Sequence, residues 1–138
     1  MAISNFKTLH TNIKAVIVAQ GFRYVKIAKW YSIDMGVFPS ALKNDCFTIK
    51  FPDLNDSTFE SDGWGLLDVS IEFVLDTQNE LYLAKIDDCI TAIRSLETLT
   101  STEYVTRTQI KTNFSSSDIL DKLLLTFNDI KLDIRSSA

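Results

Sequence analysis

The sequence predicts an α+β fold, in which a mostly antiparallel β-sheet has two amphipathic helices packed on one face. Two segments repeat apolar residues at helical spacing, so each helix needs a hydrophobic surface to cover. Several others alternate apolar and polar residues, which is typical of strands buried on one side. The 138 residues are 46% hydrophobic and contain no repeat or linker. We therefore expect one domain, spanning residues 1–138, with a core that needs no disulfide or metal.

The first helix is expected from about Asn5 to Gln20, and Gly21 follows it where a left-handed C-cap belongs. Its apolar stripe is Phe6, Leu9, Ile13, Val16 and Ile17. The next stretch, Phe22 to Ile33, is aromatic and β-branched without clean alternation, which favours a strand with an irregular continuation. Gly36 and Pro39 then indicate a loop.

Two strands are expected in the middle of the chain. The first is Cys46–Phe51, which ends where Pro52 lacks the N–H that a ladder needs. The second, Trp64–Leu75, is the clearest in the sequence, because apolar residues alternate with Asp68, Ser70 and Glu72. We expect Phe73→Ala to be costly and Glu72→Ala to cost little, since the polar face is expected to stay open.

A second helix is expected to begin at Thr77, which forms a capping box with Glu80, and to end near Leu96. Its apolar residues recur at helical spacing: Tyr82, Ile86, Cys89, Ile90 and Ile93.

The C-terminal part of the chain predicts further strands. Glu103–Phe114 alternates with one charged face, and Ser115 to Asp118 is turn-like. Leu123, Leu125 and Phe127 alternate, and Ile130 and the apolar residues after it continue with the opposite parity. The change of parity at Asn128-Asp129 indicates either a β-bulge or a two-residue turn, of which we favour the bulge.

Charge is unevenly distributed along the chain, although its net value is only −4. Residues 1–50 sum to +5, residues 51–100 to −9 and residues 101–138 to zero. The acidic balance argues against a phosphate backbone as the main partner. These charges either coat solvated faces or form opposite patches that meet between subunits.

Catalytic and metal-binding signatures were searched for and none was found: the sequence has no GxSxG, Walker loop, HExxH or CxxC pair. The single histidine, His10, is interpreted as a surface or boundary residue, and Cys46 and Cys89 as reduced thiols packed like small apolar groups. Asp87-Asp88 is interpreted as an outward pair, and Gly63-Trp64-Gly65 as a turn that enters a strand. We expect no catalytic site, no cofactor and no metal.

The segment Pro52–Gly63 is longer than a tight hairpin requires and is acidic, which is typical of a contact element. We favour a mobile loop that a partner orders over plain disorder, and we disfavour a calcium site because the spacing fits no EF-hand. The candidate contact residues are those of the loop and of the sheet's open polar face: Asp53, Asp56, Phe59, Glu60, Asp62, Asp68, Glu72, Arg107 and Lys111.

No apolar run approaches the roughly 20 residues that span a bilayer, and Lys7, His10 and Lys14 interrupt any signal-peptide core. We therefore expect neither a membrane span nor export, and synthesis in the cytoplasm.

The order of these pieces resembles the tail terminator, or tail-completion, proteins of long-tailed bacteriophages. The resemblance covers most of the chain and is carried by the Cys46–Phe51 strand, the loop end Glu60-Ser61-Asp62-Gly63-Trp64, the strand Leu66–Leu75, the second helix and a C-terminal strand near the end of the chain.

That resemblance implies a structural protein rather than an enzyme, with no cofactor. It implies a homo-hexameric ring that caps the tail tube, stops tail elongation and joins the tail to the head–connector complex. The expected partners are further copies of the chain, the tail tube protein and a head-completion or connector protein, and DNA passes the lumen without specific binding. The expected location is the virion tail or neck. The alternatives are another phage neck or head-completion protein, a small soluble ligand-binding or regulatory domain that uses the open sheet face as its pocket, and an enzyme with an unrecognised site.

Overall fold

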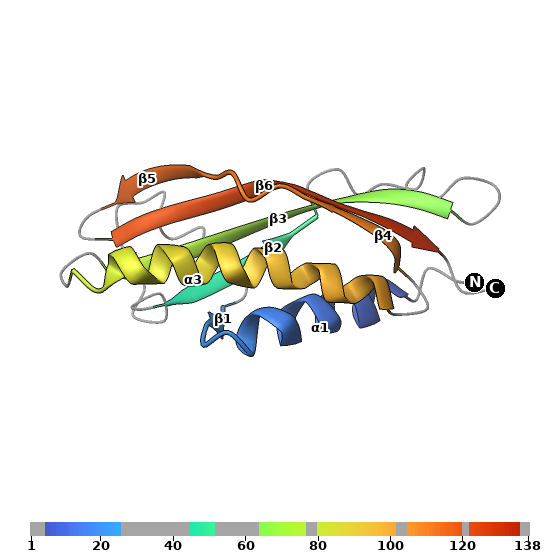
Figure 1. Cartoon of the computed structure of the whole chain (residues 1–138), viewed down its shortest axis with the longest axis horizontal. Coiled ribbons are helices and arrows are strands. Elements are labelled where there is room, and N and C mark those ends of the chain that lie inside the picture. Colours follow the sequence, from blue (N-terminus) through green and yellow to red (C-terminus); the bar gives the residue numbers. More distant parts are fainter. Residues whose placement is uncertain are drawn as a thin grey trace.

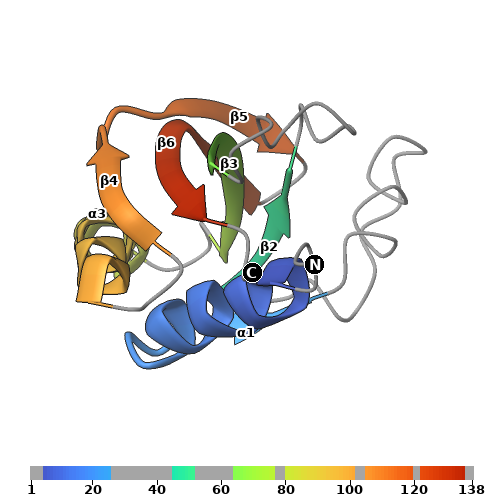
Figure 2. The same cartoon turned by 90° about the vertical axis from the view of Figure 1, so that its right-hand side faces the viewer.

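The computed structural model describes residues 5–25, 45–51, 64–76, 80–101, 105–119 and 122–135. In these ranges the chain forms a sheet with α1 (Asn5–Val18) and α3 (Tyr82–Arg94) on one side of it (Figures 1 and 2). The strands are β1 (Arg23–Tyr24), β2 (Cys46–Lys50), β3 (Trp64–Asp76), β4 (Val105–Ile110), β5 (Ser115–Ile119) and β6 (Lys122–Arg135). The expected α+β fold, with a mostly antiparallel sheet and its helices on one face, is confirmed.

The sheet has the strand order β1-β2-β3-β6-β4, and β5 also pairs with β6. Only the β1–β2 pairing is parallel, and the other described pairings are antiparallel. Strands β3 and β6 pair almost end to end, from Trp64 opposite Arg135 to Asp76 opposite Lys122. This long ribbon forms the centre of the fold.

The first helix ends as its sequence predicts. Gly21 has a φ of +95°, which a residue with a Cβ rarely adopts, and its N–H donates to the carbonyl of Val18 at 3.0 Å. Leu9, Ile13 and Ile17 are buried against the sheet. The expected strand after it is two residues long in the described part of the chain, and it pairs with β2 because Arg23 and Val25 donate to Asp45 and Phe47 at 3.0 and 2.9 Å. The loop expected around Gly36 and Pro39 lies outside the described residues.

The core lies between the helices and the inner face of the sheet. Its centre is Phe73, whose ring lies 4.9 Å from Phe22, 6.0 Å from Phe47 and 5.7 Å from Phe127, measured between centroids. Two of these contacts are edge-to-face, the arrangement that aromatic rings prefer. The helices add Cys89, Ile93 and Leu96 to this core.

Strand β6 is continuous through Asn128-Asp129, so the bulge is confirmed and the alternative turn is wrong. On β3, Val69 pairs with Ile130 and Ile71 pairs with Phe127, so β6 advances by one residue more than β3. The extra residue changes the parity of β6 and lets Phe127 and Ile130 both face the core.

The second helix begins later than the capping box predicts. Its N-cap is Leu81, which makes no side-chain cap hydrogen bond. Backbone carbonyls replace the cap, because Leu83 donates to Glu80, and Ala84 donates to Leu81, each at 3.1 Å. The helix ends at Arg94 and continues as a 3₁₀ helix, η3 (Ser95–Ser101).

The C-terminal strands also differ from the prediction. The strand expected over Glu103–Phe114 ends at Ile110, and the serine-rich stretch that is turn-like in sequence forms β5. Both β4 and β5 pair with the same edge of β6, and residues 111–114 connect them opposite the bulge. Main-chain pairing with β6 is what makes Ser115–Ile119 a strand, since serine has little β-propensity of its own.

Candidate functional site

The candidate contact residues of the sheet lie on one face, away from the helices. Asp68 and Glu72 are on β3, between the core residues of that strand. Asp68 is opposite Lys131 of β6, and Lys131 is opposite Gln109 of β4. Arg107 is opposite Asp133, and Lys111 directly follows β4. The register therefore aligns Asp68 of β3, Lys131 of β6 and Gln109 of β4 across the sheet, and their role as contact residues stays a prediction.

The loop candidates cannot be placed. Asp53, Asp56, Phe59, Glu60 and Asp62 lie outside the described residues. Their proposed contact role therefore stays a prediction.

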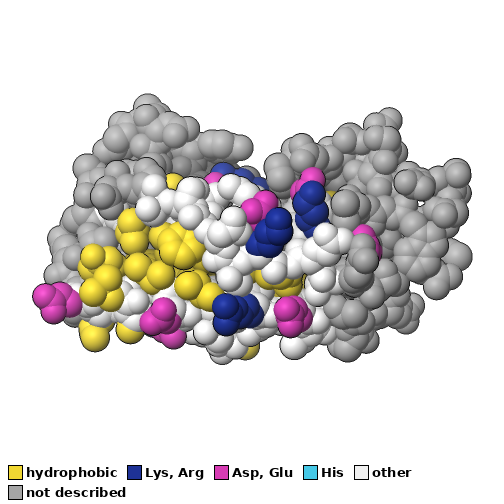
Figure 3. Space-filling view, turned by 45° about the horizontal axis from the view of Figure 1, so that its top comes forward, with side chains coloured by type: hydrophobic (Ala, Val, Ile, Leu, Met, Phe, Trp, Pro, Cys, Tyr) yellow, Lys and Arg dark blue, Asp and Glu magenta, His cyan; other side chains and the backbone are white. Residues whose placement is uncertain are grey.

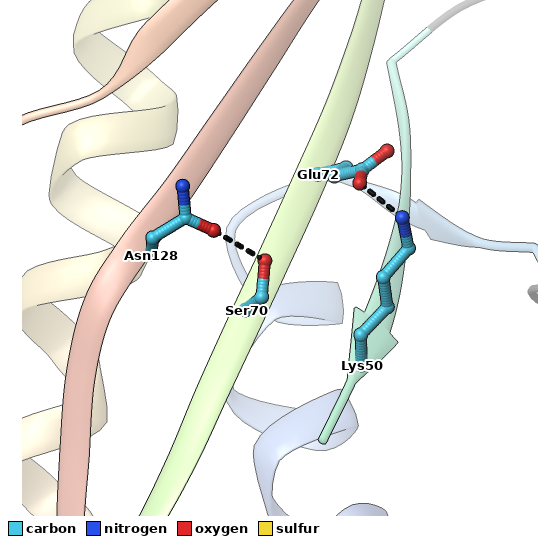
Figure 4. Close-up of polar contacts among 4 residues, drawn as sticks. All are labelled: Lys50, Ser70, Glu72 and Asn128. Atoms are coloured by element: carbon cyan, nitrogen blue, oxygen red, sulfur yellow. Dashed lines mark hydrogen bonds and ion pairs between the residues drawn. The ribbon is translucent and has the colours of Figure 1, made fainter. Parts of the chain in front are cut away.

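The polar face is not open along β2 and β3, which corrects the expectation from sequence. Thr48, Ser70 and Glu72 have relative exposures of 0%, 5% and 8%. Figure 4 shows how two of them are satisfied: Glu72 forms an ion pair with Lys50, and the Ser70 hydroxyl donates to the Asn128 side-chain oxygen at 2.9 Å. Alternation in a sequence shows which residues are polar but not whether they are exposed. These pairings satisfy the Ser70 and Glu72 side chains, and so allow them to be buried.

Thr48 is the exception on this face. It lies opposite Glu72 in the register, and its side-chain oxygen is buried without a hydrogen-bond partner. Such an orphaned hydroxyl is costly, and a bound water is its ordinary explanation in proteins.

A surface hollow of about 390 Å³ lies where β4 ends beside β6. It is lined by Gln109, Ile110, Lys111, Asp129 and Lys131. The connecting segment is fixed to the bulge, because the Lys111 N–H donates to the Asp129 carbonyl at 3.0 Å and the Asn113 amide donates to the Asp129 carboxylate at 3.0 Å.

Charges around the hollow are only partly compensated. Lys131 lies 3.8 Å from Asp68, and both side chains are partly exposed, so this pair contributes little stability. The Lys111 side chain is exposed and makes no ion pair with any residue in the described ranges. Figure 3 shows acidic and basic side chains side by side over the middle of this view, with hydrophobic side chains gathered at its left.

Phe114, at the end of the connecting segment, is an exposed hydrophobic residue. It is 39% exposed, and its ring lies 5.2 Å from that of the buried Phe127. The sequence interpretation did not single it out, since alternation alone placed it on the same face as Ile110.

A second exposed surface lies at the beginning of α3. Leu81 and Leu83 are 68% and 57% exposed, and Glu80, Asp87 and Asp88 are exposed beside them. The outward position expected for Asp87-Asp88 is confirmed. Leu83 could have been found from the sequence, because it lies off the helix's apolar stripe and four residues before Asp87.

His10 lies at the boundary between α1 and the sheet, as predicted. Its Nε2 is 3.3 Å from the Tyr24 hydroxyl, and its ring also contacts Phe51. Burial, and then the charge of Lys14, lower the pKa of His10. Burial raises the pKa of Tyr24, whose ring also lies 4.8 Å below the Lys14 ammonium.

Both cysteines are free and fully buried, as expected. Burial raises the pKa of the Cys46 thiol to about 11, although the neighbouring Arg23 acts in the opposite direction. Burial, reinforced by Asp45 and Asp88, raises the pKa of Cys89 still further. Neither thiol is therefore suited to nucleophilic chemistry near neutral pH.

No group of three or more His, Cys, Asp or Glu side chains in the described ranges could hold a metal ion. Among the helices in the same ranges, none combines the length and the apolar character that crossing a membrane requires.

Comparison with known proteins does not identify a family for this chain. No family model matches the chain, and no curated protein matches it. Among solved structures, the chain is similar to an Akkermansia muciniphila protein whose structure is described as being without its transmembrane region. The identity is 9% and the TM-score 0.40, over 100% of this chain and 87% of that one.

Proposed function

We propose that this chain is a structural protein of the phage virion, a tail terminator of long-tailed bacteriophages. In this role copies of the chain form a hexameric ring that covers the end of the tail tube and stops further tube subunits from adding. The opposite side of the ring receives the head-completion or connector protein. The proposal includes no enzymatic activity and no cofactor.

The observation that carries the proposal is the arrangement of elements around the β3–β6 ribbon. A helix precedes the sheet, a second helix follows the long strand β3, and the C-terminal strand β6 returns along β3, in the order that the sequence resemblance implies. Both helices cover one face, as Figures 1 and 2 show, and on the other face the exposed Gln109 and Lys111, at the end of β4, are available for contacts. The net charge of −4 agrees with a lumen that passes DNA without binding it specifically.

An early stop codon in this reading frame tests the proposal. An uncapped tube end still presents its self-complementary surface, so tails in such a lysate should be overlong or unjoined, and filled heads should accumulate. Supplying the chain from a plasmid should restore joined particles of normal length. Electron micrographs of joined, normal tails in the uncomplemented lysate would contradict the proposal.

The second candidate is a small ligand-binding or regulatory domain, and the hollow beside β4 favours it. Its 390 Å³ is within the size range of small-molecule sites, and Lys111, Lys131 and Gln109 could hold an anionic group. A thermal-shift screen with small carboxylates and phosphates tests this candidate. A stabilisation that Lys111→Ala abolishes would favour it over the ring.

A further inference from the structure

Both helices expose one side to solvent, and the two exposed sides differ in charge. The first surface, which we call the α1 stripe, is a set of exposed residues that helical spacing places in one line along α1: Lys7, Thr11, Lys14 and Val18. The second, which we call the α3 start, is the exposed set at the beginning of α3: Glu80, Leu81, Leu83, Asp87 and Asp88.

The α1 stripe is basic. The helix contains no acidic residue, and the exposed Lys7 and Lys14 make no ion pair with any residue in the described ranges. The Lys14 ammonium lies 4.8 Å from the centre of the Tyr24 ring, a contact that brings no negative charge to balance it. Val18, at the end of the helix, is 44% exposed. The stripe therefore offers two uncompensated cations beside an apolar side chain.

The α3 start is acidic and also exposes apolar area. The carboxylates of Glu80, Asp87 and Asp88 are exposed and make no ion pair within the part of the chain that the structure describes. The nearby Lys85 lies 3.5 Å from Asp45 and is thus engaged within the chain. The two exposed leucines of this surface, at 68% and 57%, lie between and beside the carboxylates.

The charges of the two surfaces are spaced alike. Lys7 and Lys14 are seven residues apart in the sequence, and so are Glu80 and Asp87. Seven residues make about two helical turns, or about 10 Å along a helix axis. The spacing also holds before α3 begins, because the backbone of Leu81 is already helical. Two such helices laid side by side can therefore pair both lysines with both carboxylates at once.

We infer that the α1 stripe of one copy of this chain binds the α3 start of the next copy. The contact is heterologous, because each surface carries charges of one sign and so repels its own like. In Figure 1, α3 begins at one end of the long axis and α1 begins in the other half, so one copy can use its two surfaces with two different neighbours. A head-to-tail contact of this kind generates a ring when its rotation closes, and the inference thereby deepens the proposed function, on which it rests for the ring itself.

Cysteine cross-linking tests the inference directly. The native cysteines are fully buried, so the full chain with Thr11→Cys and the full chain with Leu83→Cys each present one accessible thiol. Mixed under mild oxidation, the two variants should form a disulfide-linked heterodimer at least about tenfold faster than either variant forms a homodimer, because only the heterologous contact raises the effective concentration. Gln109→Cys, at an exposed position of β4, is the control and should not cross-link with either. Equal rates for all pairings, or no heterodimer, would overturn the inference.

Charge reversal supplies a second, independent readout. One variant carries Lys7→Glu with Lys14→Glu, and the other carries Glu80→Lys with Asp87→Lys. Each variant alone should self-associate at least about tenfold more weakly than the natural chain by sedimentation equilibrium, because its two surfaces then have the same sign.

An equimolar mixture of the two variants should recover most of the lost association, since every surface in the mixture then finds one of opposite sign. Lys111→Glu reverses an exposed charge outside both surfaces and should leave association unchanged. A mixture that associates as weakly as the separate variants would overturn the inference.

These results are separable from those on function. Cross-linking and recovery on mixing, in a chain whose stop codon leaves tails normal, would support the contact and refute the terminator role. Defective tails without the chain, together with no heterodimer, would do the reverse.

Discussion

Phe73 is the side chain at the centre of the described core. Three other aromatic rings contact it, and they come from three different segments: Phe22 after α1, Phe47 on β2 and Phe127 on β6. A residue that joins so many segments cannot be truncated without leaving a cavity that its neighbours cannot fill. Phe114, in contrast, contacts Phe127 from a position that is 39% exposed.

Phe73→Ala should lower the free energy of unfolding by about 3–5 kcal/mol, the range for truncating a buried phenylalanine. Urea unfolding measures this change, with Phe114→Ala as the matched control. The control should lose less than half as much, because its ring is already partly in water. Equal losses would contradict the difference in burial between the two rings.

Glu72 is not the replaceable surface residue that its place in the alternation suggests, because it is buried and paired with Lys50. A double-mutant cycle with Glu72→Gln and Lys50→Met should give a coupling of about 1.5–3 kcal/mol, the range for a hydrogen bond to a charged group. Urea unfolding of the four proteins measures it. Additive losses would contradict the pairing.

The two thiols should be inert in the folded chain. With the Cys46 pKa raised to about 11, on the order of one thiol in a thousand is ionised at pH 8. A thiol reagent at that pH should therefore react only as fast as the chain unfolds, and two equivalents should react at once in urea. Rapid reaction of one thiol in the native protein would show that burial has been misjudged.

At the scale of elements, the spacing of apolar residues in the sequence predicts those helices and strands that pack against the core. The helices and the long strands follow apolar spacing that the core requires, and even the β6 bulge is visible as a change of parity at Asn128-Asp129. The start of α3 and strand β5 could not be predicted, because backbone partners supply what Leu81 and the serines lack. The polar face shared by these strands was predictable from alternation. The burial of Glu72 was not, because its partner Lys50 comes from another strand. Nor was the hollow, because it depends on how β4 ends beside the bulge.

The contact of α1 with β1 should make stability depend on pH. Because the pKa of His10 is lowered from 6.5 in the folded chain, the unfolded chain binds the proton more readily. The stability that the neutral His10 contributes is therefore fully present above about pH 6.5, and it is lost as the pH falls through the lower pKa of the folded chain. Denaturant unfolding between pH 5 and 7.5 should show His10→Gln losing less stability on acidification than the natural chain. Parallel pH profiles would contradict this assignment.

At the scale of the whole molecule, the sheet separates two unlike surfaces. The start of α3, where Leu81, Leu83 and three carboxylates are exposed, lies on the side that the helices cover, and the exposed Lys111 follows the end of β4. The proposed ring requires a heterologous contact, in which one surface of each copy binds a different surface of the next copy. Its activity is then geometric, because the ring occupies the surface that the next tube subunit would use.

The most direct test of this account is to add the purified chain to a lysate of the stop-codon phage, which contains tails and filled heads but not this protein. The account predicts rings at the tail ends in electron micrographs and a rise in joined, infectious particles that saturates with added chain. The variant with Glu80→Lys and Asp87→Lys should fail to produce either, and one with Glu80→Asp and Asp87→Glu should match the natural chain. Tails that carry no ring, with no rise in joined particles at any concentration of the chain, would contradict the account.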